Sequence, residues 1–312
     1  MNRAFIFPGQ GSQSIGMGKD FFDSEPVAQQ VFKTVDKILG YSLSDIIFYS
    51  SEQELALTTN TQPAIMATSI AILELLLHKS RKNINELCRI VAGHSLGEYS
   101  ALCANGSIRL EDAAKLLKIR ARSMQEASPK GEGSMAACIG IEYSILCKLI
   151  NDVVLEGVCQ VANDNVNGQI VISGHEYNIN MVIDILKDTG YRAIKLNVSA
   201  PFHSNLMKPA ELAMKSALLD TNFTHGKIPI ISNITADSEI DITKIKANLI
   251  DQICGTVRWR ETMDKLAAIG VTELVEIGPG KVLTGLAKKS PYNFIVHNIS
   301  TLEELERFLQ VL

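Results

Sequence analysis

The chain has 312 residues, of which 46% are hydrophobic and 21% charged, and its formal net charge at pH 7 is −4. These values are ordinary for a globular protein with one large domain or two smaller ones. They provide no basic footprint for nucleic acid or for an anionic membrane surface, and we expect neither partner.

The apolar runs do not predict a membrane anchor or a signal peptide. The run Ala4–Phe7 is short and is followed by Pro-Gly. The longest apolar stretch, Ala64–Leu77, is interrupted by Thr68, Ser69 and Glu74 and is shorter than the roughly 20 residues that span a bilayer. A buried helix is the better interpretation.

The cysteine pattern predicts no metal site and no redox motif, because no two cysteines have C-x-x-C spacing. Six thiols scattered mostly among aliphatic residues, in a chain without a targeting signal, suggest a reducing cytoplasm. They are Cys88, Cys103, Cys138, Cys147, Cys159 and Cys254.

Apolar periodicity predicts the elements of the first part of the chain. In chain order they are a strand at 3–7, helices at 26–39 and 62–78, a strand at 89–93, and helices at 96–104 and 110–127. A glycine-rich loop at 8–18 follows the first strand. Strands alternating with helices are typical of an α/β sheet domain.

The pattern then changes to that of a smaller unit. It predicts a strand at 133–140, a helix at 143–151, strands at 157–163 and 169–174, a helix at 177–188 and a strand at 191–197. The order β-α-β-β-α-β is the split pattern of a ferredoxin-like unit. We therefore interpret residues 128–198 as an inserted subdomain.

The α/β pattern returns in the last part of the chain. Strands are predicted at 228–232, 272–278 and 294–299, and helices at 242–253, 258–269, 279–289 and 302–309, the third of these with Pro279 near its first turn. Residues 1–127 and 199–312 are therefore predicted to form one α/β domain around the insertion.

The segment Gly93–Gly97 reads GHSLG and lies between a predicted strand and a predicted helix. G-x-S-x-G in that context is the nucleophile elbow, in which the serine projects at a helix N-terminus that favours developing negative charge. The prediction is that Ser95 is a nucleophile. The alternative is a structural turn that happens to contain a serine.

A serine nucleophile needs a base, usually histidine. Position favours His203, in VSAPFHS, where Pro201 fixes a turn and the chain leaves the insertion. His297 is the second candidate, but it lies inside the predicted strand FIVHNI. No Asp or Glu stands out in a loop between Ser95 and His203, so an acid-containing triad and a dyad oriented by main-chain carbonyls both stay open.

Two backbone amides are candidates for an oxyanion hole. One belongs to Leu96, at the start of the helix after Ser95. The other belongs to Gln10, in the glycine-rich loop FPGQGSQ. A phosphate-binding loop is the alternative, but the lysine and the acidic residue of the known phosphate motifs are missing.

Arg120 and Met124 lie four residues apart in KIRARSMQEA and share a helix face. The neighbours of Arg120 are mostly apolar, and an inward guanidinium would need an anion, best a bidentate carboxylate. The alternative is a surface arginine paired with Glu126 or Glu111. The residues alone do not choose between the two.

These motifs occur together in a known family. FPGQGSQ, GHSLGEYSAL, RARSMQEA, PFHS, Q…VRW and EIGPGKVLTGL stand in the order and spacing of bacterial malonyl-CoA:acyl carrier protein transacylases, which the whole chain resembles. The resemblance implies an α/β-hydrolase-like large domain with a ferredoxin-like subdomain. It also implies ping-pong transfer of malonyl from malonyl-CoA to the pantetheine thiol of acyl carrier protein, for fatty-acid elongation, without a metal or redox cofactor.

The resemblance also assigns roles to residues. Ser95 resembles the acylated nucleophile and His203 its base, while the amides of Gln10 and Leu96 correspond to the oxyanion hole. The remaining assignments are Arg120 as the grip on the malonyl carboxylate, the carbonyl of Gln252 as the group that orients the histidine, Phe202 as the bulky residue found where malonyl is preferred to methylmalonyl, and Met124 and His94 as further substrate-binding residues.

Two departures from the family pattern stand out. Thr256 stands where the family often has a proline, before the V-x-W of the loop that contains Gln252, and a loop without that proline is expected to be less rigid. The residues 165–169 read NVNGQ where the family often has NSPGQ. Neither departure touches the nucleophile, the base or the arginine.

Acyl carrier proteins are acidic, so we expect a locally basic docking surface, with Lys288 and Lys289 as candidates. The alternative for this pair is a favourable charge interaction at a helix C-terminus. A monomer is expected. The rival functions are a serine esterase or thioesterase using His297, a non-catalytic acyl-binding subunit, and a transacylase serving a polyketide or malonate-decarboxylase system.

Overall fold

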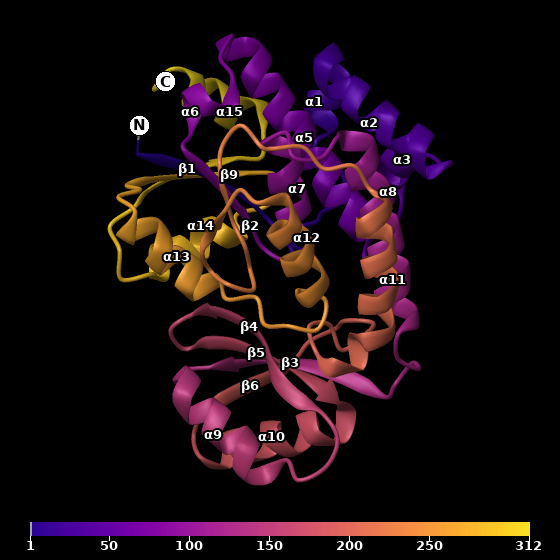
Figure 1. Ribbon diagram of the computed structural model, residues 1–312, viewed down its shortest axis with the longest axis vertical. Helices are drawn as coiled ribbons and strands as arrows, with labels where there is room; N and C mark the ends of the chain where they lie inside the picture. Colours follow the sequence, from indigo (N-terminus) through magenta and orange to yellow (C-terminus); the bar gives the residue numbers. More distant parts are fainter. Residues whose placement is uncertain (1) are drawn as a thin grey trace.

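A computed structural model describes residues 2–312 as a larger and a smaller unit (Figure 1). The larger unit contains a six-stranded sheet in the order β10-β9-β1-β2-β7-β8, whose paired strands are parallel except for β7 and β8. Its strands are β1 (Arg3–Phe7), β2 (Ile90–Gly93), β7 (Ile230–Ile231), β8 (Ser238–Glu239), β9 (Glu273–Ile277) and β10 (Ile295–Ile299).

Helices cover both faces of this sheet, and β1 shows why its strands are continuously apolar. Phe5 and Phe7 pack into one core cluster, whereas Ala4 and Ile6 pack into another on the opposite face. The helices are α1 (Lys19–Ser24), α2 (Pro26–Leu39), α3 (Leu43–Tyr49), α4 (Glu52–Leu55), α5 (Thr58–Ser80), α6 (Ile84–Leu87), α7 (Gly97–Ala104), α8 (Leu110–Glu126), the 3₁₀ turn η1 (Asn205–Met207), α11 (Lys208–Asp220), α12 (Ile242–Asp251), α13 (Trp259–Ala268), α14 (Val282–Lys289) and α15 (Leu302–Leu309).

The smaller unit is an antiparallel sheet in the order β4-β5-β3-β6. Its elements are β3 (Gly133–Ile139), α9 (Tyr143–Val153), β4 (Cys159–Val166), β5 (Gln169–His175), α10 (Glu176–Asp188) and β6 (Arg192–Lys195). The two helices pack on the face turned away from the larger unit, over a core of their own (Figure 1). The predicted fold class, an α/β unit with a βαββαβ unit, is confirmed, while the residue limits 128–198 stay a prediction.

The start of α14 differs from the sequence-based expectation. Pro279 was expected near the first turn of this helix, but the helix begins only at Val282. Gly278 and Gly280 have φ angles of 143° and 75°, which are not helical. The buried Glu276 carboxylate accepts hydrogen bonds from the first N–H groups of the helix instead, including that of Thr284 at 2.7 Å.

Other differences concern helices that the apolar pattern does not indicate. The sequence did not predict α1, α3, α4, α6 and α11, of which α4 and α6 have only four residues. Such short helices lack the two or more turns that make an apolar period visible. Helix α5 begins at Thr58, before the expected position 62, and contains Pro63.

Helix α5 is the one helix in residues 2–312 whose length and composition would allow it to cross a membrane. However, 83% of its most apolar window is buried inside the protein. The predicted buried helix is therefore confirmed, with α2 and α8 packed against it.

The two units are joined by hydrogen bonds between β4 and the loop before α13. Asp164 N donates to Val257 O (3.0 Å), and the Thr256 hydroxyl donates to Val161 O (2.6 Å). Arg260 forms an ion pair with the nearly buried Asp164 at 2.8 Å. Burial raises the pKa of Asp164, and Arg260 opposes that shift. Thr256, one of the two departures from the family pattern, thus ties its loop to the smaller unit.

Gly97, at the first position of α7, is required by the approach of that helix to β1. A Cβ there would lie 2.3 Å from Phe7 O, so Gly97→Ala is expected to lower the free energy of unfolding by about 2–3 kcal/mol, as overpacking does. Urea denaturation of the two proteins measures this.

The matched control is Gly285→Ala in α14, where an added Cβ meets nothing within 4 Å. It should be neutral or stabilising by up to about 1 kcal/mol, because alanine favours a helix over glycine. Equal stability changes in the two variants would contradict the packing argument.

Candidate active site

Ser95 lies between β2 and α7 with a left-handed backbone, φ 53°. The turn is so tight that a Cβ at Gly93 would lie 1.9 Å from Gly97 O. Asn233 braces it, since its Oδ1 accepts a hydrogen bond from Ser95 N (2.7 Å) and its Nδ2 donates to Gly93 O (2.6 Å). The geometry is that of a strained elbow that presents the serine hydroxyl.

His203 is the histidine that the fold brings to Ser95. Its Nε2 lies 2.8 Å from Ser95 Oγ, and its Nδ1 lies 2.8 Å from Gln252 O. Because a carbonyl can only accept, Nδ1 carries the proton and Nε2 is left free to accept from the serine. A main-chain carbonyl therefore occupies the place that a carboxylate has in a triad.

Burial, and secondly the charge of Arg120, lower the pKa of His203 to about 3. The imidazole is accordingly neutral in the whole physiological range, so its Nε2 is unprotonated and can accept the hydrogen bond of the serine hydroxyl. His203 also has a positive φ of 56°, so both members of the pair have strained backbones.

His297 does not take part in this arrangement. It lies in β10, where its Nε2 is 3.1 Å from a carboxylate oxygen of Glu273 and its ring packs against Phe308. It is not among the residues that line the cavity at Ser95.

Arg120 is only 1% exposed and points at the serine. Its Nη2 donates to Ser95 Oγ (3.1 Å) and to Gln252 Oε1 (2.9 Å), and its Nη1 donates to Gln62 Oε1 (2.8 Å). The guanidinium also lies 5.7 Å from the centre of the Tyr99 ring. Burial lowers the pKa of Arg120, but an arginine stays protonated in a protein. The pairing with Glu126 is made by Arg122 instead.

A cavity of about 120 Å³ brings the expected residues together. Ser95, His203 and Arg120 line it, and so do Gln10, Leu96, His94, Met124 and Phe202. Within residues 2–312, the N–H groups of Gln10 and Leu96 make no hydrogen bond. Two unpaired amides beside a serine hydroxyl can receive the oxygen of a tetrahedral intermediate.

Several buried polar residues around the site escaped the sequence analysis. Gln62 holds Arg120, Asn233 holds the elbow, and Glu98 lies behind both. Glu98 could have been found, since it lies three residues after Ser95 on the first turn of α7. Gln62 and Asn233 come from distant segments without a motif, and nothing local marks them.

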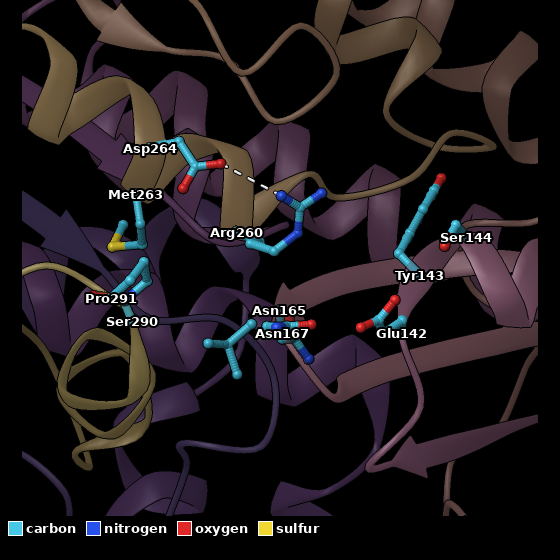
Figure 2. A pocket seen from close by; sticks show the side chains of 11 residues that line it. Glu142, Tyr143, Ser144, Asn165, Asn167, Arg260, Met263, Asp264, Ser290 and Pro291 are labelled. Carbon is cyan, nitrogen blue, oxygen red and sulfur yellow. Dashed lines mark hydrogen bonds and ion pairs between the residues drawn. The ribbon is translucent and has the colours of Figure 1, made fainter.

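Figure 2 shows a second cavity, of about 510 Å³. The β4–β5 hairpin with Asn165 and Asn167 forms one wall, and Arg260 and Asp264 of α13 form another (Figure 2). The two cavities are linked through Asn165, whose Oδ1 is 2.9 Å from Nε2 of His94. The second departure from the family pattern, NVNGQ, lies at this point.

A neutral histidine, an activated serine and two unpaired amides are together typical of enzymes whose own serine becomes acylated during the reaction. Comparison with known proteins agrees with that class. Residues 4–301 match the family described as "Acyl transferase domain". The chain is 44% identical over 311 residues to the malonyl CoA-acyl carrier protein transacylase of Bacillus subtilis (strain 168), covering 99% of this chain and 96% of that protein.

Solved structures extend the comparison to the fold. The acyl-carrier-protein-S-malonyltransferase of Bartonella henselae superimposes with a TM-score of 0.97 at 47% identity, covering 100% of this chain and 99% of that chain. A malonyl-transacylase in complex with its type II PKS acyl-carrier protein gives 0.96 at 35% identity, with full coverage of both chains. The chain belongs to the malonyl CoA-acyl carrier protein transacylase family.

The neutral state of His203 predicts an unusual pH profile for Ser95. An imidazole of pKa 6.5 would be about 90% protonated at pH 5.5 and would lose about tenfold in rate. With its pKa lowered to about 3, His203 should keep the rate of Ser95 modification by phenylmethanesulfonyl fluoride within about threefold between pH 7.5 and 5.5.

The rate is measured by intact mass against time, with the unreactive Ser95→Ala variant as the control. The lowered pKa of His203 also makes folding less favourable in acid. Below pH 6.5 the imidazole of the unfolded chain binds a proton, whereas that of the folded chain stays neutral. A tenfold loss of rate centred on pH 6.5 would contradict the assignment of a neutral, buried base.

Proposed function

We propose that this protein transfers malonyl from malonyl-CoA to the pantetheine thiol of acyl carrier protein, through a malonyl-serine, and so supplies fatty-acid elongation. One observation carries the proposal most directly. A buried guanidinium lies 3.1 Å from the nucleophile in a cavity of about 120 Å³. Such a cavity suits a short acyl group with a terminal carboxylate, which an arginine can bind through two hydrogen bonds.

The first half-reaction follows from the geometry. His203 Nε2 takes the proton of Ser95 Oγ as Oγ bonds to the thioester carbonyl carbon. The amides of Gln10 and Leu96 donate to the carbonyl oxygen as it gains negative charge. The carbon–sulfur bond then breaks, and the proton held by His203 goes to the departing thiolate of coenzyme A.

The second half-reaction reverses these roles. His203 takes the proton of the pantetheine thiol, whose sulfur attacks the malonyl-serine carbon. The carbon–oxygen bond breaks, and the proton returns to Ser95 Oγ. Throughout, Arg120 holds the malonyl carboxylate so that its acyl carbon stays between the serine and the amides. Phe202 and Met124 are among the other residues that line the cavity, and they limit the room for a methyl branch.

The thioester arm has to lie outside the small cavity. A cleft of about 680 Å³ adjoins it and shares Leu196 and Val198 with it. Its walls come from the start of α5, the segment after α8 and the segment after β6, so that it runs between the two units. We assign this cleft to the pantetheine arm of either substrate.

The partner and the compartment are part of the same proposal. A relative of the same fold was solved in complex with its type II PKS acyl-carrier protein, so a carrier protein as acceptor suits this chain too, in fatty-acid or in polyketide synthesis. Six free cysteines fit a reducing cytoplasm, and a monomer suffices for the site because one chain supplies all of its residues.

Acyl transfer is tested by intact mass after brief mixing with malonyl-CoA. A single malonyl adduct should form, be absent in Ser95→Ala and disappear when acyl carrier protein is added. Arg120→Ala should lower kcat/KM for malonyl-CoA by about 100- to 1000-fold, because a buried charged partner is lost. Acetyl-CoA, which has no carboxylate, is the matched control.

Equal labelling by acetyl-CoA, independent of Arg120, would leave a serine enzyme but exclude the malonyl assignment. An adduct that water discharges and the carrier protein does not would favour a thioesterase.

Docking of the acidic carrier protein is expected at the end of α14. Lys288 and Lys289 are exposed there, and Lys289 Nζ lies 3.3 Å from Gln169 Oε1 of the smaller unit. The double change Lys288→Glu and Lys289→Glu should raise the KM for acyl carrier protein about five- to tenfold at low salt and leave the KM for malonyl-CoA unchanged.

Added salt should reduce the difference in KM for acyl carrier protein between the double variant and the unaltered protein, because salt screens exposed charges. The control is the double change Lys208→Glu and Lys215→Glu on α11. If both doubles raised the KM equally, or if neither did, docking at α14 would be wrong.

A further inference from the structure

Glu98 is a buried carboxylate that the mechanism above does not use. It is 1% exposed, lies in the first turn of α7, and does not line the catalytic cavity. Its Oε2 accepts from Gln252 Nε2 (2.7 Å) and from Asn233 N (3.1 Å). In residues 2–312 no cationic side chain pairs with it within 4 Å. A buried carboxylate without an ion partner is costly, so its position calls for an explanation.

The explanation begins with Gln252, which forms hydrogen bonds with His203, Arg120 and Ser95. Its main-chain oxygen is 2.8 Å from His203 Nδ1, and its side-chain Oε1 accepts from Arg120 Nη2 at 2.9 Å. Its Nε2 donates to Glu98 and to Ser95 O (3.1 Å). One residue thus holds the base by its backbone and the arginine by its side chain.

A carboxamide can turn by 180°, which exchanges its oxygen and its NH₂ group. Arg120 only donates hydrogen bonds, so it requires the oxygen of Gln252. An ionised carboxylate only accepts, so Glu98 takes the NH₂ group. Glu98 and Arg120 therefore fix the same orientation from opposite sides.

The row of hydrogen bonds from Glu98 through the Gln252 side chain to Arg120 has a second consequence. Gln252 separates Glu98 from Arg120, and all three hydrogen-bond acceptors of the guanidinium are neutral oxygens, from Gln62, Ser95 and Gln252. The Nε atom of Arg120 is buried without a partner. The positive charge is held in place but not neutralised by a direct ion pair, and a donor is left for an incoming carboxylate.

Glu98 also supports the elbow. Asn233, whose N–H donates to Glu98, accepts the N–H of Ser95 through its side chain. Burial raises the pKa of Glu98 to about 7, and the hydrogen bonds from Asn233 and Gln252 oppose that shift. A protonated carboxyl still offers one carbonyl oxygen, so the bond from Gln252 does not require the charge.

We propose that Glu98 is a positioning residue for malonyl transfer, which orients Gln252 and through it sets both the guanidinium of Arg120 and the imidazole of His203. The Arg120 half of this inference rests on the proposed function, whereas the His203 half concerns the reactivity of Ser95 toward any acylating or sulfonylating reagent.

The experiment compares two substitutions of equal size. Glu98→Gln keeps an acceptor oxygen, and Glu98→Leu removes it. The control is Glu276→Leu, which removes another buried carboxylate that caps α14 and does not line the cavity. The thermal midpoint, the kcat and KM for malonyl-CoA, and the rate of Ser95 modification by phenylmethanesulfonyl fluoride are measured for each.

Glu98→Leu should lower kcat/KM for malonyl-CoA about 100-fold, partly through a raised KM, and slow the sulfonyl fluoride about tenfold, as expected for lost charge-assisted hydrogen bonds. Glu98→Gln should recover both rates to within about threefold. Glu276→Leu should lower the thermal midpoint and leave both rates unchanged.

A folded Glu98→Leu variant with normal KM and normal sulfonyl fluoride rate would reduce Glu98 to a structural role and overturn the inference. If Glu98→Leu does not fold, Glu98→Asp decides, since it keeps the charge but is one methylene too short to reach Gln252. Full activity of Glu98→Asp would likewise overturn the inference. If the unaltered protein reacts with the sulfonyl fluoride but never with malonyl-CoA, the proposed function fails, and the sulfonyl fluoride rates still test Glu98.

Discussion

The site depends on how a guanidinium is kept almost fully buried without an ion partner. Arg120 is 1% exposed, and a charge in such a place is tolerated only if its donors are satisfied. Amide and hydroxyl oxygens from three segments far apart in the chain accept from Nη1 and Nη2, and only Nε is buried without a partner within residues 2–312. Each of these segments must therefore be correctly placed before the arginine can be. The pocket, the elbow and the loop with Gln252 therefore depend on one another for their structure.

The two reacting groups reach the site from different directions. Ser95 comes from the middle of the parallel sheet, whereas His203 follows the segment that leads back from the smaller unit. Their 2.8 Å separation thus depends on the joint between the units, where Val257 and Thr256 bond to β4. Gln252, a few residues before that joint, holds the imidazole. The smaller unit contributes to catalysis by fixing where the base stands.

Local patterns were sufficient for every strand of the larger sheet except the two-residue β8, for the longer helices except α11, and for the elbow. They sufficed because β1 and β2 are buried apolar runs, and because a glycine-flanked serine between a strand and a helix has few other conformations. Arg120 could be placed on a helix face but not inside the protein, since its burial depends on Gln62 and Gln252 from distant segments. Asn233 and Glu98 could not be predicted for the same reason. They act through contacts between segments more than 130 residues apart, and no local sequence pattern indicates such contacts.

Within residues 2–312, Ser95 and His203 are two of the four non-glycine residues with positive φ. Left-handed backbone at such residues costs of order 1–3 kcal/mol each, which the surrounding hydrogen bonds must offset. Stability and activity are therefore in conflict at these two positions. Glycine at either position would relieve the backbone strain but abolish the reaction. Selection for thermal stability alone would therefore replace Ser95 and His203, and their retention indicates selection for catalytic activity.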